Sequence, residues 1–249
     1  LKAQGIPATV FVCSGQVGSA REFWWDDLER LLLTPGRLPA TLAVSVGGRE
    51  LSWAGIETSF ARSDLERFKA WNVLTPPPTA RHRLYAELCR LLRPLAVDER
   101  ARLVGEVAAW AQRPAEGRPS HRALDREELR SLAADGLVEI GSHTVDHPVL
   151  AGLPAEAQRR QIEDDKRALE ALLGETVGSF AYPFGGSSDY DAAAIRLVKE
   201  AGFARACANF AGRLDAGTDP FQLPRFIVRD WDGPEFARRL DGFRRTAGT

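Results

Sequence analysis

The chain has 249 residues, of which 44% are hydrophobic and 27% charged, and its formal net charge at pH 7 is −1. This length accommodates one large domain or two small ones around a substantial core, and the near-neutral charge gives no electrostatic reason to expect a nucleic acid or an anionic membrane as a partner. No apolar run approaches the roughly 18 residues that a membrane-spanning helix requires, so we expect no transmembrane segment.

The start of the sequence and its cysteines bear on where the protein works. The chain opens with Leu1 and contains no methionine, so we interpret it as a fragment or a processed chain, in which a missing signal peptide carries no information. Its cysteines, Cys13, Cys89 and Cys207, fit neither a disulfide framework nor a Cys-x-x-Cys metal knuckle. We expect all three to be structural, which leans towards a reducing, cytoplasmic compartment.

The N-terminal segments predict the end of a helix, a strand and a second helix. Residues 6–13 are β-branched and aromatic and are followed by Ser-Gly, which is typical of a buried strand. The residues before them resemble the last turn of a helix that ends at Gly5. Residues 21–33 show an apolar helical pattern that stops at Pro-Gly.

Residues 36–120 are interpreted as an insertion, because their pattern departs from the strand–helix alternation that follows. Residues 41–46 and 50–53 flank two glycines and are predicted to form a hairpin. Two amphipathic helices are expected at about 80–92 and 98–111, after a run of three prolines.

After residue 120 the predicted strands and helices alternate regularly. Asp125 and Glu128 fit a capping box at the start of the first helix. Strands that alternate with helices of this length indicate parallel βα units, hence an α/β sheet or barrel. We expect helices at 125–134, 154–173, 189–201 and 234–243, and strands at 137–142, 177–182, 203–210 and 226–228.

Two histidines, His143 and His147, follow directly on a predicted strand. Parallel α/β folds place their active sites at the C-terminal ends of strands. A helical metalloprotease would carry a glutamate at Thr144, and Pro148 disfavours a helix, so a loop is expected here. Zinc needs a third ligand; Asp146 could serve, or could instead orient an imidazole or cap the following turn. Taken alone, the spacing favours two ordinary polar histidines.

A second feature is the turn Tyr182-Pro183-Phe184-Gly185, which ends the next predicted strand. An aromatic–Pro–aromatic–Gly turn at this place can form a rigid wall for a sugar ring and present backbone N–H groups to an oxyanion. The alternative interpretation is a packed turn without a ligand.

Together and in this order, these features resemble the polysaccharide deacetylase family (the NodB-homology group, carbohydrate esterase family four). The resemblance covers roughly residues 1–20 and 120–235 and only loosely the insertion between them. The segments that carry it are Gly5 to Val12, Val138 to His143 with His147-Pro148, Phe180 to Gly185, and Glu200 to Phe203.

The resemblance implies a distorted (β/α) barrel, here expected as a single domain over residues 1–249 with the helical insertion at about 36–120. It implies hydrolysis of N-acetyl groups on a glycan or glycolipid precursor, with zinc or another divalent metal ion as cofactor. The implied partner is a carbohydrate that bears N-acetyl groups. The oligomeric state stays open.

The family pattern also assigns roles to individual residues. His143 and His147 would be metal ligands. The backbone N–H of Phe184 would help to bind the tetrahedral oxyanion. Tyr182, Pro183 and Phe184 would line the sugar site.

Three departures from the family pattern bear on activity. The family's Asp-Asp pair, which supplies a base and a metal ligand, lies upstream of the first strand of this chain, so we expect the third ligand, the base and one barrel strand to be missing, with an unpaired sheet edge. Ala181 stands where many members carry an arginine that holds the base. No histidine follows the Tyr-Pro-Phe-Gly turn, where the family often has its catalytic acid.

These departures keep a runner-up open, a non-catalytic carbohydrate-binding or scaffold domain with a degenerate site. The retained histidines favour the enzyme, whereas Ala181 and the absent acid histidine favour the runner-up. The charged run at residues 163–167 is predicted to be the solvated face of a helix.

Overall fold

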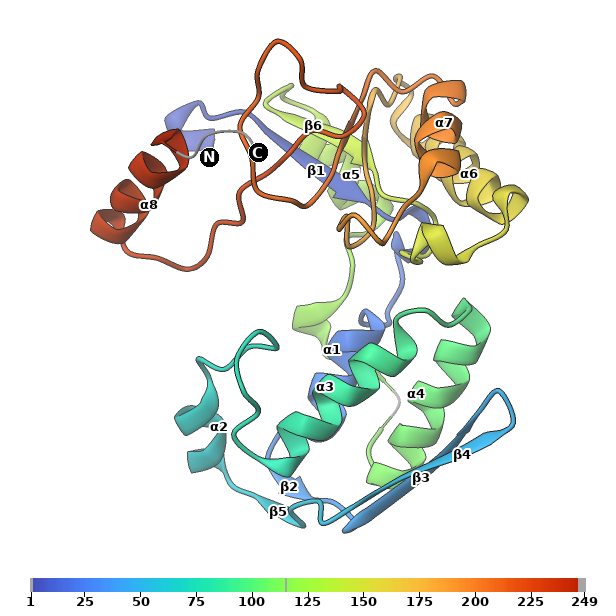
Figure 1. The fold of residues 1–249 in the computed structure, drawn as a ribbon, viewed down its shortest axis with the longest axis vertical. Coiled ribbons are helices and arrows are strands. Elements are labelled where there is room, and N and C mark those ends of the chain that lie inside the picture. Colours follow the sequence, from blue (N-terminus) through green and yellow to red (C-terminus); the bar gives the residue numbers. More distant parts are fainter. Residues whose placement is uncertain (1, 115, 246–249) are drawn as a thin grey trace. The chain divides into compact units, whose positions relative to one another are not determined.

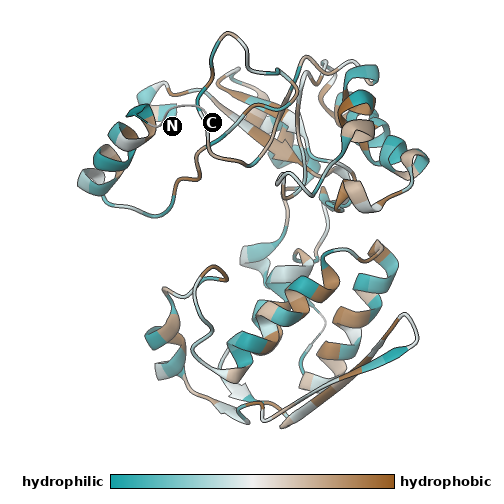
Figure 2. Cartoon of the chain, viewed as in Figure 1, coloured by the Kyte–Doolittle hydropathy of each residue, from teal (hydrophilic) through white to brown (hydrophobic). Residues whose placement is uncertain are grey.

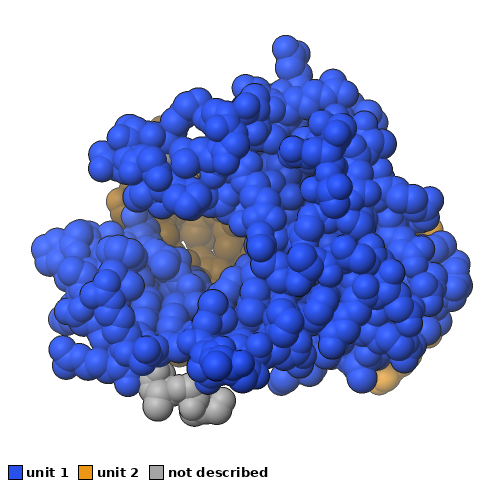
Figure 3. All heavy atoms as spheres, turned by 90° about the horizontal axis from the view of Figure 1, so that it is seen from above, with its two compact units in different colours: residues 1–17, 124–249 blue, residues 18–123 orange. Residues whose placement is uncertain are grey.

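The structure, a computed structural model, describes residues 2–114 and 116–245 (Figure 1). These residues group into two compact units (Figure 3). The first, the sheet unit, consists of the described residues up to 17 together with those from 124 onwards; the second, the inserted unit, spans 18–123. The inserted unit contains the insertion predicted at about 36–120 and begins before it, at Gly18. A single domain carrying this insertion stays a prediction.

The sheet unit is built on four parallel strands in the order β1-β6-β7-β8. The predicted α/β class with a parallel sheet is thereby confirmed. Among the described residues the sheet is open, with β1 at one edge, so its closure into a barrel stays a prediction. The strands are β1 (Ala8–Val12), β6 (Val138–Ser142), β7 (Ser179–Ala181) and β8 (Arg205–Cys207).

The helices of the sheet unit begin and end at residues suited to their termini. The carboxylate of Asp125 accepts hydrogen bonds from the backbone N–H groups of Glu127 and Glu128, both at 2.9 Å, which confirms the predicted capping box. Gly174 ends α6 in the left-handed conformation, with φ 75°. The described chain has no helix that is both long and apolar enough to cross a membrane. The helices are α5 (Arg126–Ala133), α6 (Ala155–Leu173), α7 (Ala192–Glu200) and α8 (Gly233–Arg245).

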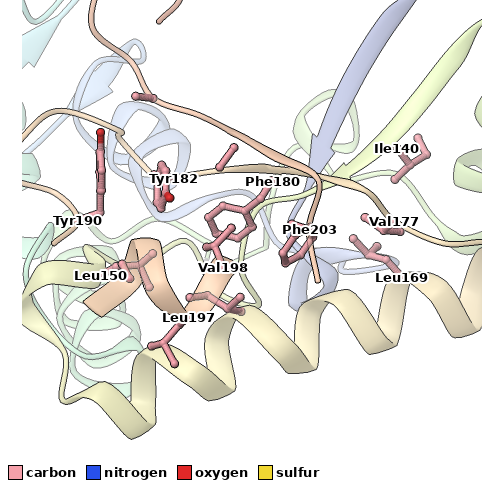
Figure 4. Close-up of a cluster of buried hydrophobic side chains, with 14 of the residues drawn as sticks. Ile140, Leu150, Leu169, Val177, Phe180, Tyr182, Tyr190, Leu197, Val198 and Phe203 are labelled. Carbon is pink, nitrogen blue, oxygen red and sulfur yellow. The ribbon is translucent and has the colours of Figure 1, made fainter. Parts of the chain in front are cut away.

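The core of the sheet unit lies between the sheet and helices α5, α6 and α7 (Figure 4). Alternate strand positions point towards the helices, and Ile140, Phe180 and Ala206 are each at most 3% exposed. On the other face the ring of Phe11 lies so close to Gly141 that a Cβ there would come within 2.5 Å of it. The helices contribute Leu129, Ile162, Leu169, Leu197 and Val198 to this core.

The C-terminal part of the sheet unit departs from the prediction. The strand expected at 203–210 is shortened to β8, and a bridge joins Cys207 to Leu223 in the following loop. Residues 226–228, expected as a short strand, belong to no strand of the described chain, and Ile227 and Val228 are more than half exposed. These short segments have too few local contacts for their sequence to fix their pairing.

The inserted unit packs three helices against a β-hairpin. The hairpin predicted at 41–46 and 50–53 is confirmed. Along α3 and α4, hydrophobic and hydrophilic residues both occur (Figure 2), and the buried positions recur every three or four residues, as in amphipathic helices. The unit starts before residue 36 because α1 packs against α3 and α4. Its elements are α1 (Trp24–Leu32), β2 (Gly36–Arg37), β3 (Thr41–Val46), β4 (Arg49–Ala54), β5 (Ser59–Phe60), α2 (Arg62–Phe68), α3 (Ala80–Leu92) and α4 (Val97–Ala111).

A buried ion-pair group joins the first and last segments of the inserted unit. Glu22 is 4% exposed; its Oε2 lies 2.7 Å from Nη2 of Arg118 and its Oε1 lies 3.3 Å from Nε of Arg30. Burial alone would raise the pKa of Glu22, but hydrogen bonds from Arg118 and the charges of both arginines hold that pKa below its usual range. Glu22 and Arg118 are 96 residues apart in the sequence.

Candidate functional site

The two histidines lie on the loop that follows β6. Their ring centroids are 4.8 Å apart and the ring planes are nearly perpendicular, at 79°. Thr144 and His147 have positive φ values of 69° and 54°, and the N–H of His147 donates to Oγ1 of Thr144 at 3.1 Å. The pair therefore sits on a strand-end loop, as the sequence predicted, and not on a helix.

The imidazole of His143 is oriented by a single hydrogen bond. Its Nδ1 lies 2.6 Å from the carbonyl oxygen of Ala181, and because a carbonyl only accepts, Nδ1 must carry the hydrogen. The lone pair is then on Nε2, the arrangement found in most metal-binding histidines. Burial lowers the pKa of His143 to about 4, which this hydrogen bond only partly opposes, so the ring is neutral at pH 7.

A buried carboxylate on α6 fixes the backbone around His143. Asp165 accepts hydrogen bonds from the N–H of Ser14 at 2.7 Å, the hydroxyl of Ser142 at 2.5 Å and the N–H of His143 at 3.1 Å. Burial raises its pKa to about 6, although these hydrogen bonds favour the ionised form. Asp165 thus ties the C-terminal ends of β1 and β6 together from behind the sheet.

The prediction that residues 163–167 form a solvated face is wrong for Asp165, which is fully buried. The buried positions of α6 repeat every three or four residues, and position 165 falls among them. This periodicity could have predicted from the sequence that Asp165 is buried, but the charged residues on either side of it suggested a solvated face. The set is Gln158, Ile162, Asp165, Leu169 and Leu172.

Asp146 holds the histidine loop against α6. Its Oδ2 accepts from Nε2 of Gln161 at 2.8 Å, and its N–H donates to Oε1 of the same glutamine at 3.0 Å. Of the roles left open for Asp146, this reciprocal pairing supports positioning of the loop.

The described residues contain no group of three or more His, Cys, Asp and Glu side chains placed to hold a metal ion. Two imidazoles, one with its tautomer set, fit two of the three protein ligands that a catalytic zinc normally has. The two histidines therefore match two positions of such a ligand set, and the described residues do not complete it.

The Tyr-Pro-Phe-Gly turn brings Phe184 to the histidines. The rings of Phe184 and His147 meet edge to face with centroids 4.7 Å apart. Asn209 holds the turn: its side-chain amide donates to the carbonyl of Phe184 at 2.9 Å and its backbone N–H donates to that of Gly185 at 2.8 Å. A Cβ on Gly185, whose φ is 73°, would lie 2.9 Å from the backbone nitrogen of Asn209, so only glycine fits.

Backbone strain is concentrated at this place. Four non-glycine residues of the described chain have a positive φ, and three of them, Thr144, His147 and Phe184, lie here. Such conformations cost about 1–3 kcal/mol each and gather at functional sites. The sequence-predicted residues His143, His147 and Phe184 are thus brought together in a strained, well-supported loop pair.

The remaining two predicted site residues face the interior. Tyr182 is 1% exposed, stacks on Tyr190 at a centroid distance of 4.0 Å (Figure 4), and donates its hydroxyl to the carbonyl of Phe221 at 3.0 Å. Pro183 is also buried. The side chain of Tyr182 points to the same core as that of Phe180, two residues before it. Tyr182 and Pro183 therefore lie beneath the turn, and neither side chain is accessible to a sugar in this structure.

Residues 98–206 match the model of the family described as Polysaccharide deacetylase. This stretch includes both histidines and the whole Tyr-Pro-Phe-Gly turn. The resemblance to the polysaccharide deacetylase family is confirmed. A curated relative, "Putative polysaccharide deacetylase YxkH" of Bacillus subtilis (strain 168), is 24% identical over 105 residues, which are 42% of this chain and 36% of that protein. The chain thus spans about a third of the length of this relative.

Several solved deacetylase structures are similar in part. The Streptococcus pyogenes deacetylase PplD, in complex with acetate, is 20% identical with a TM-score of 0.43 and is matched over 49% of this chain and 52% of its own. IcaB from Ammonifex degensii is 18% identical with a TM-score of 0.43, over 59% and 68% of the two chains. The polysaccharide deacetylase BC0361 from Bacillus cereus is 22% identical with a TM-score of 0.42, over 48% and 37%.

Proposed function

We propose that this chain carries the histidine half of a carbohydrate de-N-acetylase site, which hydrolyses the amide of N-acetyl groups on a glycan or glycolipid precursor. The observation that carries the proposal is the pairing of His143 with His147 beside Phe184, with the tautomer of His143 set by the carbonyl of Ala181. The family match over the same residues supports the reaction class.

A divalent metal ion, for which zinc is our proposal, would be held by His143 and His147 and by a third ligand from outside the described residues. When bound, such an ion supplies the Lewis acidity that polarises an amide carbonyl and activates water. The neutral state of His143 at pH 7 keeps its Nε2 lone pair available for this role.

The chain's own residues have separate tasks in the proposed reaction. The backbone N–H of Phe184 would donate to the oxyanion that forms at the acetyl carbon, and the Asn209 hydrogen bonds keep the turn in place while it does so. The ring of Phe184, partly exposed next to His147, would cover one side of the acetyl group and limit access of bulk water. Tyr182 and Pro183 would support this turn from below.

The proposal is tested by zinc affinity and acetate release measured on the same variants, in a protein that also includes the segment supplying the third ligand and the base. We expect His143→Ala and His147→Ala each to lower zinc affinity by about 100-fold or more, since ligand loss exceeds the 10–100-fold effect of second-sphere changes, and to abolish acetate release from N-acetylglucosamine oligomers. His121→Ala in the inserted unit is the matched control and should change neither. Unchanged zinc affinity in both site variants would contradict the assignment of the histidines as metal ligands. Acetate release by His143→Ala would contradict the assignment of this site as a de-N-acetylase.

A further inference from the structure

The inserted unit contains a pocket of about 290 Å³ that the proposed reaction does not use. Its walls come from α1, β5, α2, α3 and the turn after α2, all within residues 29–85. Five aromatic rings dominate the lining, which is unusual for a surface of an otherwise leucine-rich unit. These rings belong to Phe60, Phe68, Trp71, His82 and Tyr85.

The rings hold one another in a defined arrangement around His82. The centroid of His82 lies 4.7 Å from that of Trp71, 5.3 Å from that of Phe68 and 6.0 Å from that of Phe60. Tyr85 meets Trp71 edge to face at 5.9 Å. Phe60 and His82 are buried, so they form the floor of the pocket, whereas Trp71 and Tyr85 are partly exposed and can contact a ligand.

Hydrogen bonds fix two of these rings in place. Nε1 of Trp71 donates to the carbonyl of Pro76 at 3.2 Å, and Nδ1 of His82 lies 2.8 Å from the hydroxyl of Thr79, the N-cap of α3. Burial lowers the pKa of His82, so its ring is neutral at pH 7 and carries both a donor and an acceptor nitrogen. The pocket is therefore preorganised, which reduces the entropic cost of binding.

The charges around the pocket select a neutral ligand. The guanidinium groups of Arg67 and Arg81 lie 5.1 Å and 5.4 Å from the ring centroids of Phe68 and Phe60, so these rings already interact with cations. The lining itself carries one charge of each sign, and both are already paired: Glu29 lies 2.8 Å from Arg118 and Lys69 lies 3.4 Å from Glu66. An ionic ligand therefore finds no unpaired counter-charge in the lining, whereas a neutral ligand with apolar faces and a rim of hydroxyl groups needs none.

The volume limits the ligand to a small one. A pocket of about 290 Å³ is at the lower end of the range of roughly 300–1,000 Å³ for small-molecule sites. One sugar ring fits this space and an oligosaccharide does not. Val73, which also lines the pocket, is 55% exposed, so the pocket opens to solvent beside it.

We propose that the aromatic pocket of the inserted unit binds a single neutral pyranose ring, as a carbohydrate subsite made of residues other than those of the histidine site. The ligand class rests on the proposed function, which provides a glycan as the substrate of the same chain. The geometric case for the pocket rests on the rings, charges and volume alone.

The test is a calorimetric titration of the full chain with N-acetylglucosamine, glucose, galactose and mannose. We expect at least one of them to bind, with Trp71→Ala weakening that binding about tenfold or more (~1.4 kcal/mol). Trp71→Phe, which keeps a ring face, should restore most of the affinity and guards against a variant that merely unfolds. Trp110→Ala, in α4 and outside the pocket lining, is the matched control and should bind like the wild type.

His143→Ala separates this proposal from the proposed function. Sugar binding that survives in His143→Ala but falls in Trp71→Ala supports the pocket, whatever the acetate assay shows. Acetate release by the wild type together with unchanged sugar binding in Trp71→Ala would contradict the proposed sugar subsite and leave the proposed de-N-acetylase function supported. Absence of binding for all four sugars would overturn it as well.

Discussion

Glu22 of the inserted unit and Asp165 of the sheet unit are both buried carboxylates, and they are stabilised in different ways. In the inserted unit Glu22 faces the guanidinium groups of Arg118 and Arg30, and its pKa is held low. In the sheet unit Asp165 receives only neutral donors, from Ser14, Ser142 and His143, and burial raises its pKa to about 6. Burial acts in the same direction on both, so the counter-charge decides the sign of the shift.

Because their partners differ, the two buried carboxylates have different structural roles. Glu22 contributes a strong attraction between segments that are distant in the sequence. Asp165 instead organises backbone N–H groups at the ends of two strands, where a positive counter-charge would sit next to the histidines and oppose a bound cation. A neutral donor set is therefore suited to a site that is itself proposed to bind a metal.

The largest effect is expected from Glu22→Gln. Removing the carboxylate charge takes the shared buried counter-ion from Arg118 and Arg30, although Arg118 keeps Glu29 at 2.8 Å and Arg30 keeps Asp27 at 2.6 Å. We therefore expect a cost of about 3 kcal/mol, the lower end of the range for a broken buried pair. The free energy of unfolding measured by urea titration should fall by this amount. A loss below about 1 kcal/mol would show that the pair behaves like a surface ion pair and would remove the contrast with Asp165.

Asp165→Asn should have a smaller effect. The amide keeps the shape of the carboxylate but turns one acceptor into a donor, which then faces the N–H of Ser14 or the donors on Ser142 and His143. We expect a loss of about 1–3 kcal/mol, the cost of an unsatisfied buried donor, in the same urea titration. A loss as large as that of Glu22→Gln would mean that neutral donors stabilise a carboxylate as strongly as two arginines do.

The pH dependence of the Glu22 contribution sharpens the comparison further. Because the folded-state pKa of Glu22 is lowered, its stabilisation is present above the unfolded-state pKa, ordinarily about 4.3, and is lost as the pH falls through the lower folded value. The stability difference between wild type and Glu22→Gln should be constant from pH 7 to about pH 5 and shrink below it. A difference that grows on acidification would contradict this sign.

The smallest effect is expected for an exposed pair. Glu156 and Arg160 on α6 lie 3.5 Å apart with side chains 68% and 61% exposed. Glu156→Gln should change the free energy of unfolding by no more than about 0.5 kcal/mol. This variant serves as the baseline for the two buried carboxylates, and a larger loss would show that charge removal alone, independent of burial, explains part of their effects.

Local patterns predicted much of the fold. The strands that became β1 and β6, the hairpin at 41–46 and the capping box at Asp125 were all expected, because β-branched runs, paired glycines and an Asp-x-x-Glu motif act over short distances. The start of the inserted unit was not predictable in the same way. It depends on packing between α1 and helices far along the chain, and on a pair of residues separated by 96 positions.

The candidate site was predicted in part. His143, His147 and Phe184 were expected together and lie together, because strand ends in a parallel sheet meet at one edge. Tyr182 was expected to line the sugar site, whereas its side chain points to the same core as that of Phe180, two residues before it. Asp165 was missed because its charged neighbours masked its position on the buried face of α6.

The pairing of Glu22 with Arg118 has a consequence for engineering of this chain. The inserted unit joins its own first and last segments, 96 residues apart in the sequence, through this contact, so part of the entropic cost of closing the long loop is offset within the unit itself. A sequence that replaces residues 18–123 would have to supply an equivalent contact between its two ends.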